Sequence, residues 1–273
     1  MRPTEHVLDM FAVPGALEPV AGGQGRSVRA GDLLLSPGRE PRVQDRLSPP
    51  LARLAVELDT RPGRDHRDLR IAMPVPARDG SWVVDGWAAT RFEPAARELT
   101  DPAATRAVGA VLHAELSRAI TCWPPAQEPP VGRWSVAERV AFGEDPLPDG
   151  IDPEVQGLLD HLAAARDDTD LGPAQLVHGD LAGNVLLDPQ GAPVVIDLAP
   201  YWRPALWAEA VWVLDAVMWF GADPSVMDEF ATGAPRQAMV RAALFRLLSD
   251  RPPDVGAFER ALGLDTARPK LDA

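Results

Sequence analysis

Two short polar loops, each set between apolar runs, constrain this chain more than any other feature. The first loop carries His178, Asp180 and Asn184, and the second carries Asp197 within residues 194–198. Short runs of Leu, Val and Ile bounded by turn residues are typical of buried strands. We therefore expect three short strands in this region, the first two joined by a loop and the last two by a turn. This order places the four polar side chains on two loops.

These residue types suit the transfer of a phosphoryl group to a hydroxyl. Asp180 can receive or orient the proton of an acceptor hydroxyl. Asn184 and Asp197 offer the amide and carboxylate oxygens that Mg²⁺ binds. They lie thirteen positions apart, the length of a hairpin, so both can reach one metal ion. His178 is expected to brace its loop through hydrogen bonds.

The combined motif resembles that of the aminoglycoside phosphotransferase and choline kinase-like superfamily, small-molecule relatives of the protein kinases. The matching residues are His178-Gly179-Asp180, Asn184 and Asp197. The resemblance implies an α+β, bilobal protein-kinase-like fold, ATP as donor, Mg²⁺ as cofactor and Asp180 as catalytic base. It extends over most of the chain if the N-terminal strands form the nucleotide-binding lobe. Each loop alone is also an ordinary turn sequence.

Residues 1–87 are predicted to form a strand-rich, nucleotide-binding lobe with one helix. Strands are expected at residues 17–20, 27–30, 33–35, 69–75 and 81–87, and the helix at residues 50–59. A glycine loop follows the first strand, where backbone N–H groups can approach a triphosphate closely. Its predicted nucleotide-binding residues are Gly22, Gly23, Gln24 and Gly25.

The lobe boundary is placed at the end of this strand-rich part. Trp87, Ala88 and Ala89 are predicted to be the hinge that contacts adenine, although Trp87 also fits a strand-end aromatic that packs on the core. Residues 88–273 are predicted to form a helical lobe that carries the catalytic and metal loops. Its helices are expected around residues 104–116, 152–162, 204–220, 224–231, 235–249 and 254–262.

Two departures from the resembled pattern bear on activity. Only residues 181–183 separate Asp180 from Asn184, one fewer than in kinase catalytic loops. Gly183 can compensate by adopting a positive φ. In addition, Ser36 lies where strand three of a kinase carries a phosphate-binding lysine.

Lys270 is the only lysine of the chain, so an arginine would have to replace the missing one. Arginine binds phosphate through a planar fork rather than as a point charge. The nearby candidates are Arg26, Arg29, Arg39 and Arg42. Glu57 is the best candidate for the helix acid that pairs with such a cation, and a solvated surface acid is the alternative reading.

Charge and composition restrict the partners. The net charge of −13 repels nucleic-acid phosphates, so we expect no nucleic-acid partner. It suits a cationic small acceptor, and it also serves solubility. Cys122 is the single cysteine, which excludes an internal disulfide. We find no apolar leader and expect a cytoplasmic protein with no membrane partner.

Several other residues have two readings each. The apolar helix at residues 204–220 contains Glu209 and Asp215, which we expect to pair with arginines, Glu209 with Arg203. His113 fits a core or surface histidine better than a catalytic one. Two further groups of residues, both rich in aromatic side chains, also need an interpretation. Trp207, Trp212 and Trp219 are predicted core residues, whereas Tyr201, Trp202 and Arg203 either wall the acceptor pocket or pack as a loop.

The predicted function is an ATP- and Mg-dependent O-phosphotransferase acting on a small-molecule hydroxyl, aminoglycoside-like or another metabolite. Because Ser36 replaces the lysine, a catalytically impaired, pseudokinase-like nucleotide-binding or regulatory module is the alternative. Transfer of AMP is a third reading. The sequence leaves open the acceptor, the choice between ATP and GTP, and the oligomeric state.

Overall fold

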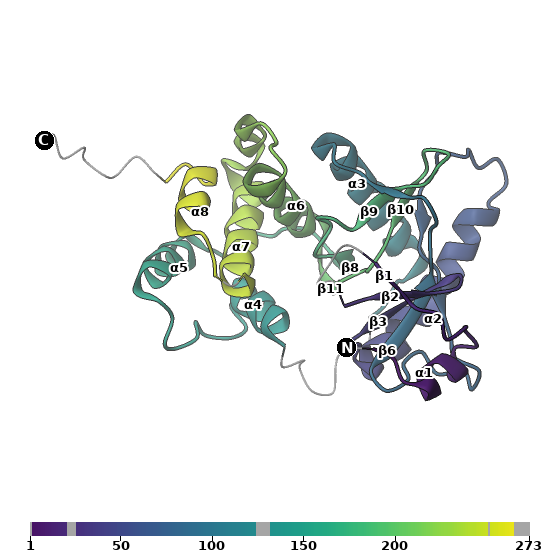
Figure 1. The fold of residues 1–273 in the computed structure, drawn as a ribbon. Helices are drawn as coiled ribbons and strands as arrows, with labels where there is room; N and C mark the ends of the chain where they lie inside the picture. The colour runs from purple at the N-terminus through teal and green to yellow at the C-terminus, as the bar shows by residue number, and fades with distance from the viewer. Residues whose placement is uncertain (1, 21–25, 124–131, 251, 265–273) are drawn as a thin grey trace, which may run out of the picture. The chain divides into compact units, whose positions relative to one another are not determined.

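The computed structural model describes residues 2–20, 26–123, 132–250 and 252–264 (Figure 1). Contacts between residues divide the chain into two compact units, and each is described by itself. Unit 1 comprises Met1–Asp101, Ala114–Ile120 and Gly183–Pro200. Unit 2 comprises Pro102–His113, Thr121–Ala182 and Tyr201–Ala273. The α+β prediction is confirmed, because unit 1 is built on two sheets and unit 2 mainly on helices.

The first sheet of unit 1 is antiparallel and has five strands. Across the sheet they are β1 (Glu18–Pro19), β2 (Val28–Ala30), β3 (Leu33–Pro37), β6 (Trp87–Arg91) and β5 (Pro74–Val75). Leu33 and Leu35 of β3 are buried and Leu34 is less so, the alternation of a sheet with one covered face. Pro74 lies on the edge strand, where a missing N–H costs no ladder bond.

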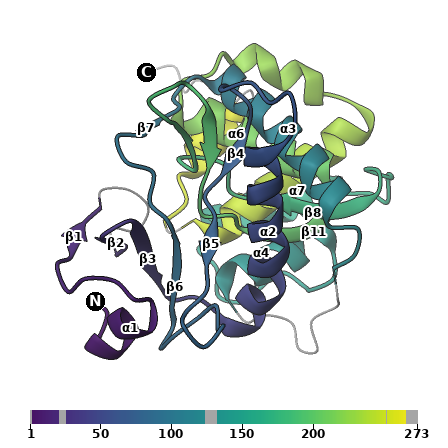
Figure 2. The ribbon, with the colours of Figure 1, turned by 90° about the vertical axis from the view of Figure 1, so that its right-hand side faces the viewer.

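Two helices pack against the sheets of unit 1. Helix α1 (Glu5–Met10) was not predicted; the Thr4 side chain caps it, and Val7 packs in the core of the first sheet. Helix α2 (Pro41–Thr60) packs on β5 and on β4 (Arg70–Ile71), a strand of the second sheet (Figure 2). It begins nine residues before the predicted start at residue 50.

The second sheet of unit 1 joins segments that are far apart in the sequence. Its strands, in order, are β4 (Arg70–Ile71), β10 (Pro193–Val195), β9 (Val185–Leu187) and β7 (Arg97–Glu98). Strand β10 is parallel to β4 and antiparallel to β9. The predicted strand at residues 69–75 is therefore two short strands, one in each sheet.

The predicted strand at residues 81–87 needs correction, whereas the predicted lobe boundary stays a prediction. The predicted strand at residues 81–87 is wrong, because a tight turn at Asp85 and Gly86 delays the strand until Trp87. The predicted lobe boundary after residue 87 falls inside β6, whose residues pair with β3 through Arg91. By contacts, unit 1 runs on to Asp101 and gathers two later segments.

Unit 2 is organised around helix α7, which contacts α4, α5, α6 and η1 (Figure 1). Its elements are α4 (Arg133–Phe142), α5 (Pro153–Ala165), β8 (Ala174–His178), β11 (Pro200–Pro204), α6 (Ala205–Trp219), the 3₁₀ helix η1 (Pro224–Phe230), α7 (Gly233–Ser249) and α8 (Val255–Ala261). Strands β8 and β11 pair with each other. Helix α3 (Pro102–Ala119) divides between the units at His113. Helix α4 was not predicted.

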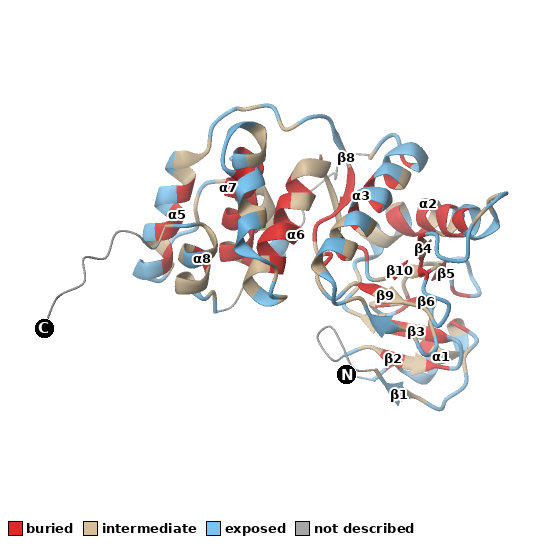
Figure 3. Cartoon of the chain, turned by 90° about the horizontal axis from the view of Figure 1, so that it is seen from above, coloured by how far each residue is buried: buried red, intermediate tan, exposed pale blue. Residues whose placement is uncertain are grey.

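Burial in unit 2 follows the apolar sequence of α6 and α7 (Figure 3). Trp207 and Trp212 are buried, as predicted, but Trp219 is 48% exposed and is not a core residue. Asp152 caps α5, since its side chain accepts a hydrogen bond from the Glu154 N–H. Among the residues that the structure describes, no helix combines the length and apolarity needed to span a membrane.

Candidate active site

The loop that follows β8 in unit 2 is held by two histidines. The backbone N–H of His178 donates to Nε2 of His113 at 3.2 Å, and Nδ1 of His178 accepts from the Asp180 N–H at 3.1 Å. Both rings are buried. His178 thus braces the loop through hydrogen bonds, as the sequence predicted.

His113 is a second brace that sequence reasoning did not identify. It lies on α3, and its backbone carbonyl accepts a hydrogen bond from the Gln175 side chain at 2.8 Å. Burial, together with the neighbouring His178, lowers the pKa of His113 to about 4. The ring is therefore neutral near pH 7, with Nε2 as acceptor and the proton on Nδ1. No local pattern marks His113, because its partner is 65 positions away.

Asp180 is tied to a buried arginine. Nη2 of Arg246, on α7, lies 2.8 Å from Oδ1 of Asp180, and the same guanidinium contacts both carboxylate oxygens of Asp215 on α6. Asp215 is fully buried, Arg246 nearly so, and the Asp180 side chain is 47% exposed. One oxygen of Asp180 is thereby fixed while the side chain remains open to solvent.

The charges of Asp180 and Asp215 affect the pKa of Arg246, and the charge of Arg246 affects the pKa of Asp215. Burial raises the pKa of the Asp215 carboxyl, against the opposing effect of Arg246. Burial also works against the charge of Arg246, but the two carboxylates outweigh it and hold its pKa above the ordinary value. The expectation that Asp215 pairs with an arginine is confirmed. Arg246 itself was missed, because nothing local distinguishes it from other arginines.

Gly179 is needed for close packing rather than for an unusual backbone conformation. A Cβ atom there would lie 2.4 Å from the Tyr201 ring. That ring also packs edge-on against Trp207 and Phe245. Burial, with Glu138 nearby, raises the pKa of the Tyr201 hydroxyl. Of its two predicted readings, Tyr201 fits loop packing.

The neighbouring charges pair differently from the prediction. Arg203 contacts Glu138 and Glu144. Glu209 pairs with Arg106 at 2.7 Å, so the predicted Glu209–Arg203 pair is wrong. Arg106 comes from α3, an element distant in the sequence that no local spacing indicates.

The predicted metal residues lie at the open end of the β9–β10 hairpin in unit 1. The Ile196 N–H donates to the Asn184 carbonyl at 3.0 Å, one step beyond the pair formed by Val185 and Val195. Asp197 directly follows Ile196. The hairpin register thus brings the backbones at Asn184 and Asp197 to the same end of one ribbon.

The backbone is unusual on both sides of this hairpin. Gly183 has φ +69°, as predicted for the shortened loop. Asp197 has φ +45°, in the left-handed region that few residues other than glycine adopt. Such conformations cost free energy and concentrate at functional sites. The position of Asp197 is therefore consistent with a functional rather than a structural aspartate.

Asp197 is paired with Arg39, one of the four arginines considered above. Nη2 of Arg39 lies 2.6 Å from Oδ1 of Asp197, and the Asp197 side chain is 47% exposed. Ser36 instead exchanges a hydrogen bond with the Ser27 hydroxyl at 3.0 Å. Glu57 pairs with arginines outside the first sheet, at an exposed surface, which fits the surface-acid alternative.

The other predicted nucleotide residues fall in different places. The glycine loop, Gly22, Gly23, Gln24 and Gly25, lies outside the described residues. Trp87, Ala88 and Ala89 lie within β6, opposite Pro37, Ser36 and Leu35 of β3. Trp87 and Ala89 are buried. All three residues belong to strand β6 and not to the connection that follows it. Their contact with adenine remains a prediction.

The donor set suits magnesium better than a metal held wholly by protein. Within the described ranges, no three His, Cys, Asp or Glu side chains gather to hold a metal ion. Mg²⁺ commonly binds through one or two carboxylates, water and substrate phosphates. Asn184 and the half-exposed Asp197 fit that pattern.

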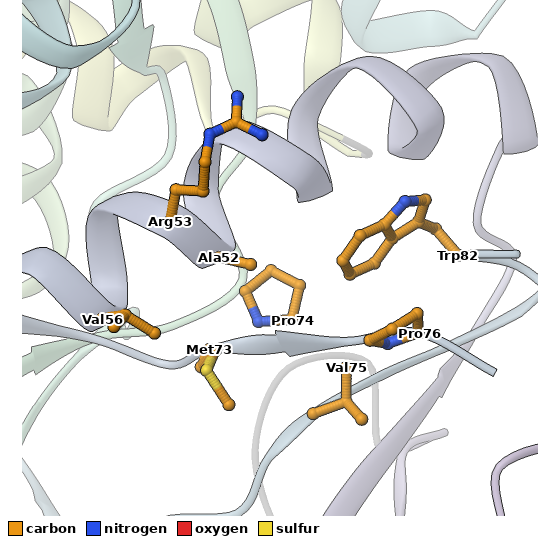
Figure 4. A pocket seen from close by; sticks show the side chains of 8 residues that line it. All are labelled: Ala52, Arg53, Val56, Met73, Pro74, Val75, Pro76 and Trp82. Atoms are coloured by element: carbon orange, nitrogen blue, oxygen red, sulfur yellow. The ribbon is translucent and has the colours of Figure 1, made fainter. Parts of the chain in front are cut away.

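A separate hollow of about 410 Å³ lies on unit 1 between α2 and the segment around β5 (Figure 4). Its lining is mainly apolar, and it shares no residue with the predicted site. The lining residues are Ala52, Arg53, Val56, Met73, Pro74, Val75, Pro76 and Trp82.

No protein-family model matches the sequence, and no curated protein is detectably similar to it. Several solved structures are similar in fold, including the three that follow. A spectinomycin phosphotransferase bound to AMP is 13% identical, with 89% of this chain and 83% of that chain covered and a TM-score of 0.48. A choline/ethanolamine kinase family protein from Mesorhizobium loti is 17% identical, with coverages of 94% and 92% and a TM-score of 0.49. A macrolide 2′-phosphotransferase from Brachybacterium faecium is 19% identical, with coverages of 98% and 100% and a TM-score of 0.44.

Proposed function

We propose that this chain is an ATP- and Mg-dependent O-phosphotransferase that acts on a small-molecule hydroxyl. The observation that carries the proposal is the hairpin end where Asn184 and a left-handed, half-exposed Asp197 meet. In the sequence, only residues 181–183 separate Asp180 from Asn184.

Asp180 is assigned the acceptor hydroxyl. Its carboxylate orients the hydroxyl and takes its proton while the oxygen forms a bond to the γ-phosphorus and the bond to the leaving ADP oxygen breaks. The contact with Arg246 at 2.8 Å fixes the side chain in one orientation. A fixed carboxylate lowers the cost of aligning the acceptor.

Asn184 and Asp197 are assigned to Mg²⁺, held through an amide oxygen and a carboxylate oxygen. When bound, Mg²⁺ neutralises negative charge on the transferring phosphates. Gly22, Gly23, Gln24 and Gly25 are proposed to contact the phosphates, and Trp87, Ala88 and Ala89 to lie near adenine. The acceptor is proposed to be neutral or cationic, because the net charge of −13 disfavours anions.

A nucleotide-binding module without turnover is the second candidate. The observation that favours it is Ser36, which is bonded to Ser27 and offers no positive charge to a phosphate. Such a module would bind Mg·ATP but release no γ-phosphate to any acceptor.

Two measurements separate these functions. Calorimetry of ATP with and without Mg²⁺ tests the nucleotide site, and mass spectrometry across a panel of hydroxyl and amine compounds tests transfer. The enzyme predicts a product heavier by one phosphate that disappears in Asp180→Asn. Binding without any product supports the module, an AMP adduct would indicate AMP transfer, and no nucleotide binding would refute the proposal.

A further inference from the structure

Arg39 lies near the end of strand β3 and already contacts a predicted metal ligand. It follows β3 by two residues, and its backbone N–H donates to the Gly86 carbonyl at 3.0 Å. Its guanidinium reaches Asp197 with an N–O distance of 2.6 Å. All of these residues belong to unit 1.

The strand itself cannot supply the missing charge. Ser36 is short, neutral and bonded to Ser27. Arg29 is engaged elsewhere: it pairs with Glu18, donates to the Gly31 carbonyl and lies 4.6 Å from the Phe92 ring centre. Arg39 differs because its partner is the carboxylate that the proposed function assigns to Mg²⁺.

Magnesium and Arg39 would compete for the same carboxylate. A divalent cation on Asp197 repels the neighbouring guanidinium unless an anion compensates the added charge. The phosphates of a nucleotide supply that anion, and a guanidinium fork matches phosphate oxygens well. The Arg39 side chain is mostly covered, at 27% exposure.

We propose that Arg39 is the phosphate-binding cation of this chain, in place of a lysine on β3. It holds Asp197 when no nucleotide is present and transfers to the nucleotide phosphates when Asp197 takes Mg²⁺. This inference rests on the proposed nucleotide function and adds to it a specific residue and an exchange of partners.

The test compares two ligands in Arg39→Ala. Binding of AMP-PNP with Mg²⁺, followed by calorimetry, should weaken about 10- to 100-fold, because a charge-assisted phosphate contact is lost. Binding of Mn²⁺ alone, followed by electron paramagnetic resonance, should tighten about two- to fivefold, because Asp197 loses a competing cation. Arg39→Lys should fall between Arg39→Ala and the wild type for the nucleotide.

Arg78→Ala is the matched control. It breaks another ion pair of unit 1, with Asp9 at 2.7 Å, and should leave both affinities unchanged. Equal urea midpoints for the two alanine variants would show that Arg39→Ala is folded.

Opposite changes for the two ligands support the inference, since a purely structural arginine would weaken both. An unchanged nucleotide affinity in Arg39→Ala, with normal binding by the wild type, would overturn the role of Arg39 alone. A parallel loss of both ligands would also overturn it. Failure of the wild-type chain to bind AMP-PNP would overturn the proposed function as well.

Discussion

Arg246 joins the predicted catalytic loop of unit 2 to the interior of its helices. Its guanidinium lies between Asp215, which is fully buried, and Asp180. Replacing it by leucine leaves the Asp215 carboxylate buried without a counter-charge. We expect Arg246→Leu to lower the free energy of unfolding by about 3–5 kcal/mol, measured by urea denaturation.

The double variant Arg246→Leu/Asp215→Leu separates charge from packing. Because both buried charges are removed together, it should recover most of the lost stability. Arg106→Leu breaks two more exposed pairs, with Glu209 and Glu229, and should cost about 1 kcal/mol or less per pair. A double variant as unstable as the single one would contradict the proposed coupling.

Gly179 offers a test of packing at the same loop. The Cβ of Gly179→Ala would meet the Tyr201 ring at 2.4 Å, so we expect a loss of about 1–3 kcal/mol in thermal unfolding. Gly157→Ala is the control, since it lies in α5 with open space around the added carbon. It should stabilise by up to about 1 kcal/mol. Equal effects at the two positions would refute the packing argument.

At the residue scale, what could be predicted depended on local spacing. The φ of Gly183 followed from a loop one residue short, and the bracing role of His178 followed from its place in the motif. Arg39, Arg246 and His113 act through partners that the fold brings together from distant positions. No local pattern in one sequence marks such partners.

Among the elements, α3 supports β8 in part through the buried ring of His113. His113 has a pKa of about 4, below its ordinary value of 6.5. Between these pH values the unfolded chain binds a proton that the folded chain does not. The free energy of unfolding should therefore fall as pH drops from 6.5 towards 4, by up to about 1.4 kcal/mol per unit.

Urea denaturation at several pH values measures this contribution. His113→Gln keeps an acceptor for the His178 N–H but cannot titrate, so its stability should depend less on pH in that window. His66→Gln removes an exposed histidine and should leave the dependence as in the wild type. Identical slopes for all three proteins would exclude His113 as the source.

The elements that were mispredicted have identifiable causes. Proline normally breaks a helix, so Pro49 and Pro50 led to a predicted helix that starts too late. Helix α2 contains both prolines in its interior. The Pro-rich sequence at residues 124–132 favoured an irregular connection, so helix α4, which begins at Arg133, was not predicted. The aromatic and β-branched residues at 81–87 suggested a strand, but only Trp87 belongs to β6, because Asp85 and Gly86 form a turn just before it.

At the scale of the whole molecule, the order of elements was predictable and their grouping was not. A strand-rich part, a helix-rich part and the β9–β10 hairpin all follow from periodicity and turn residues. The parallel pairing of β10 with β4 does not, because it depends on contacts over more than a hundred positions. That pairing assigns residues 183–200 to unit 1.

The grouping of these strands in unit 1 predicts which segments of the chain become more stable when the ligand binds. At 100 times its dissociation constant, Mg²⁺ with AMP-PNP should stabilise the structure that binds it by about 2.7 kcal/mol. Hydrogen exchange should then slow in β3, β9 and β10 together, although β3 lies about 150 positions before β9. Asp197→Asn should abolish the effect at the same nucleotide concentration. Slower exchange in β3 without any change in β9 and β10 would show that the hairpin does not take part in the site, and the assignment of Asn184 and Asp197 to magnesium would then be wrong.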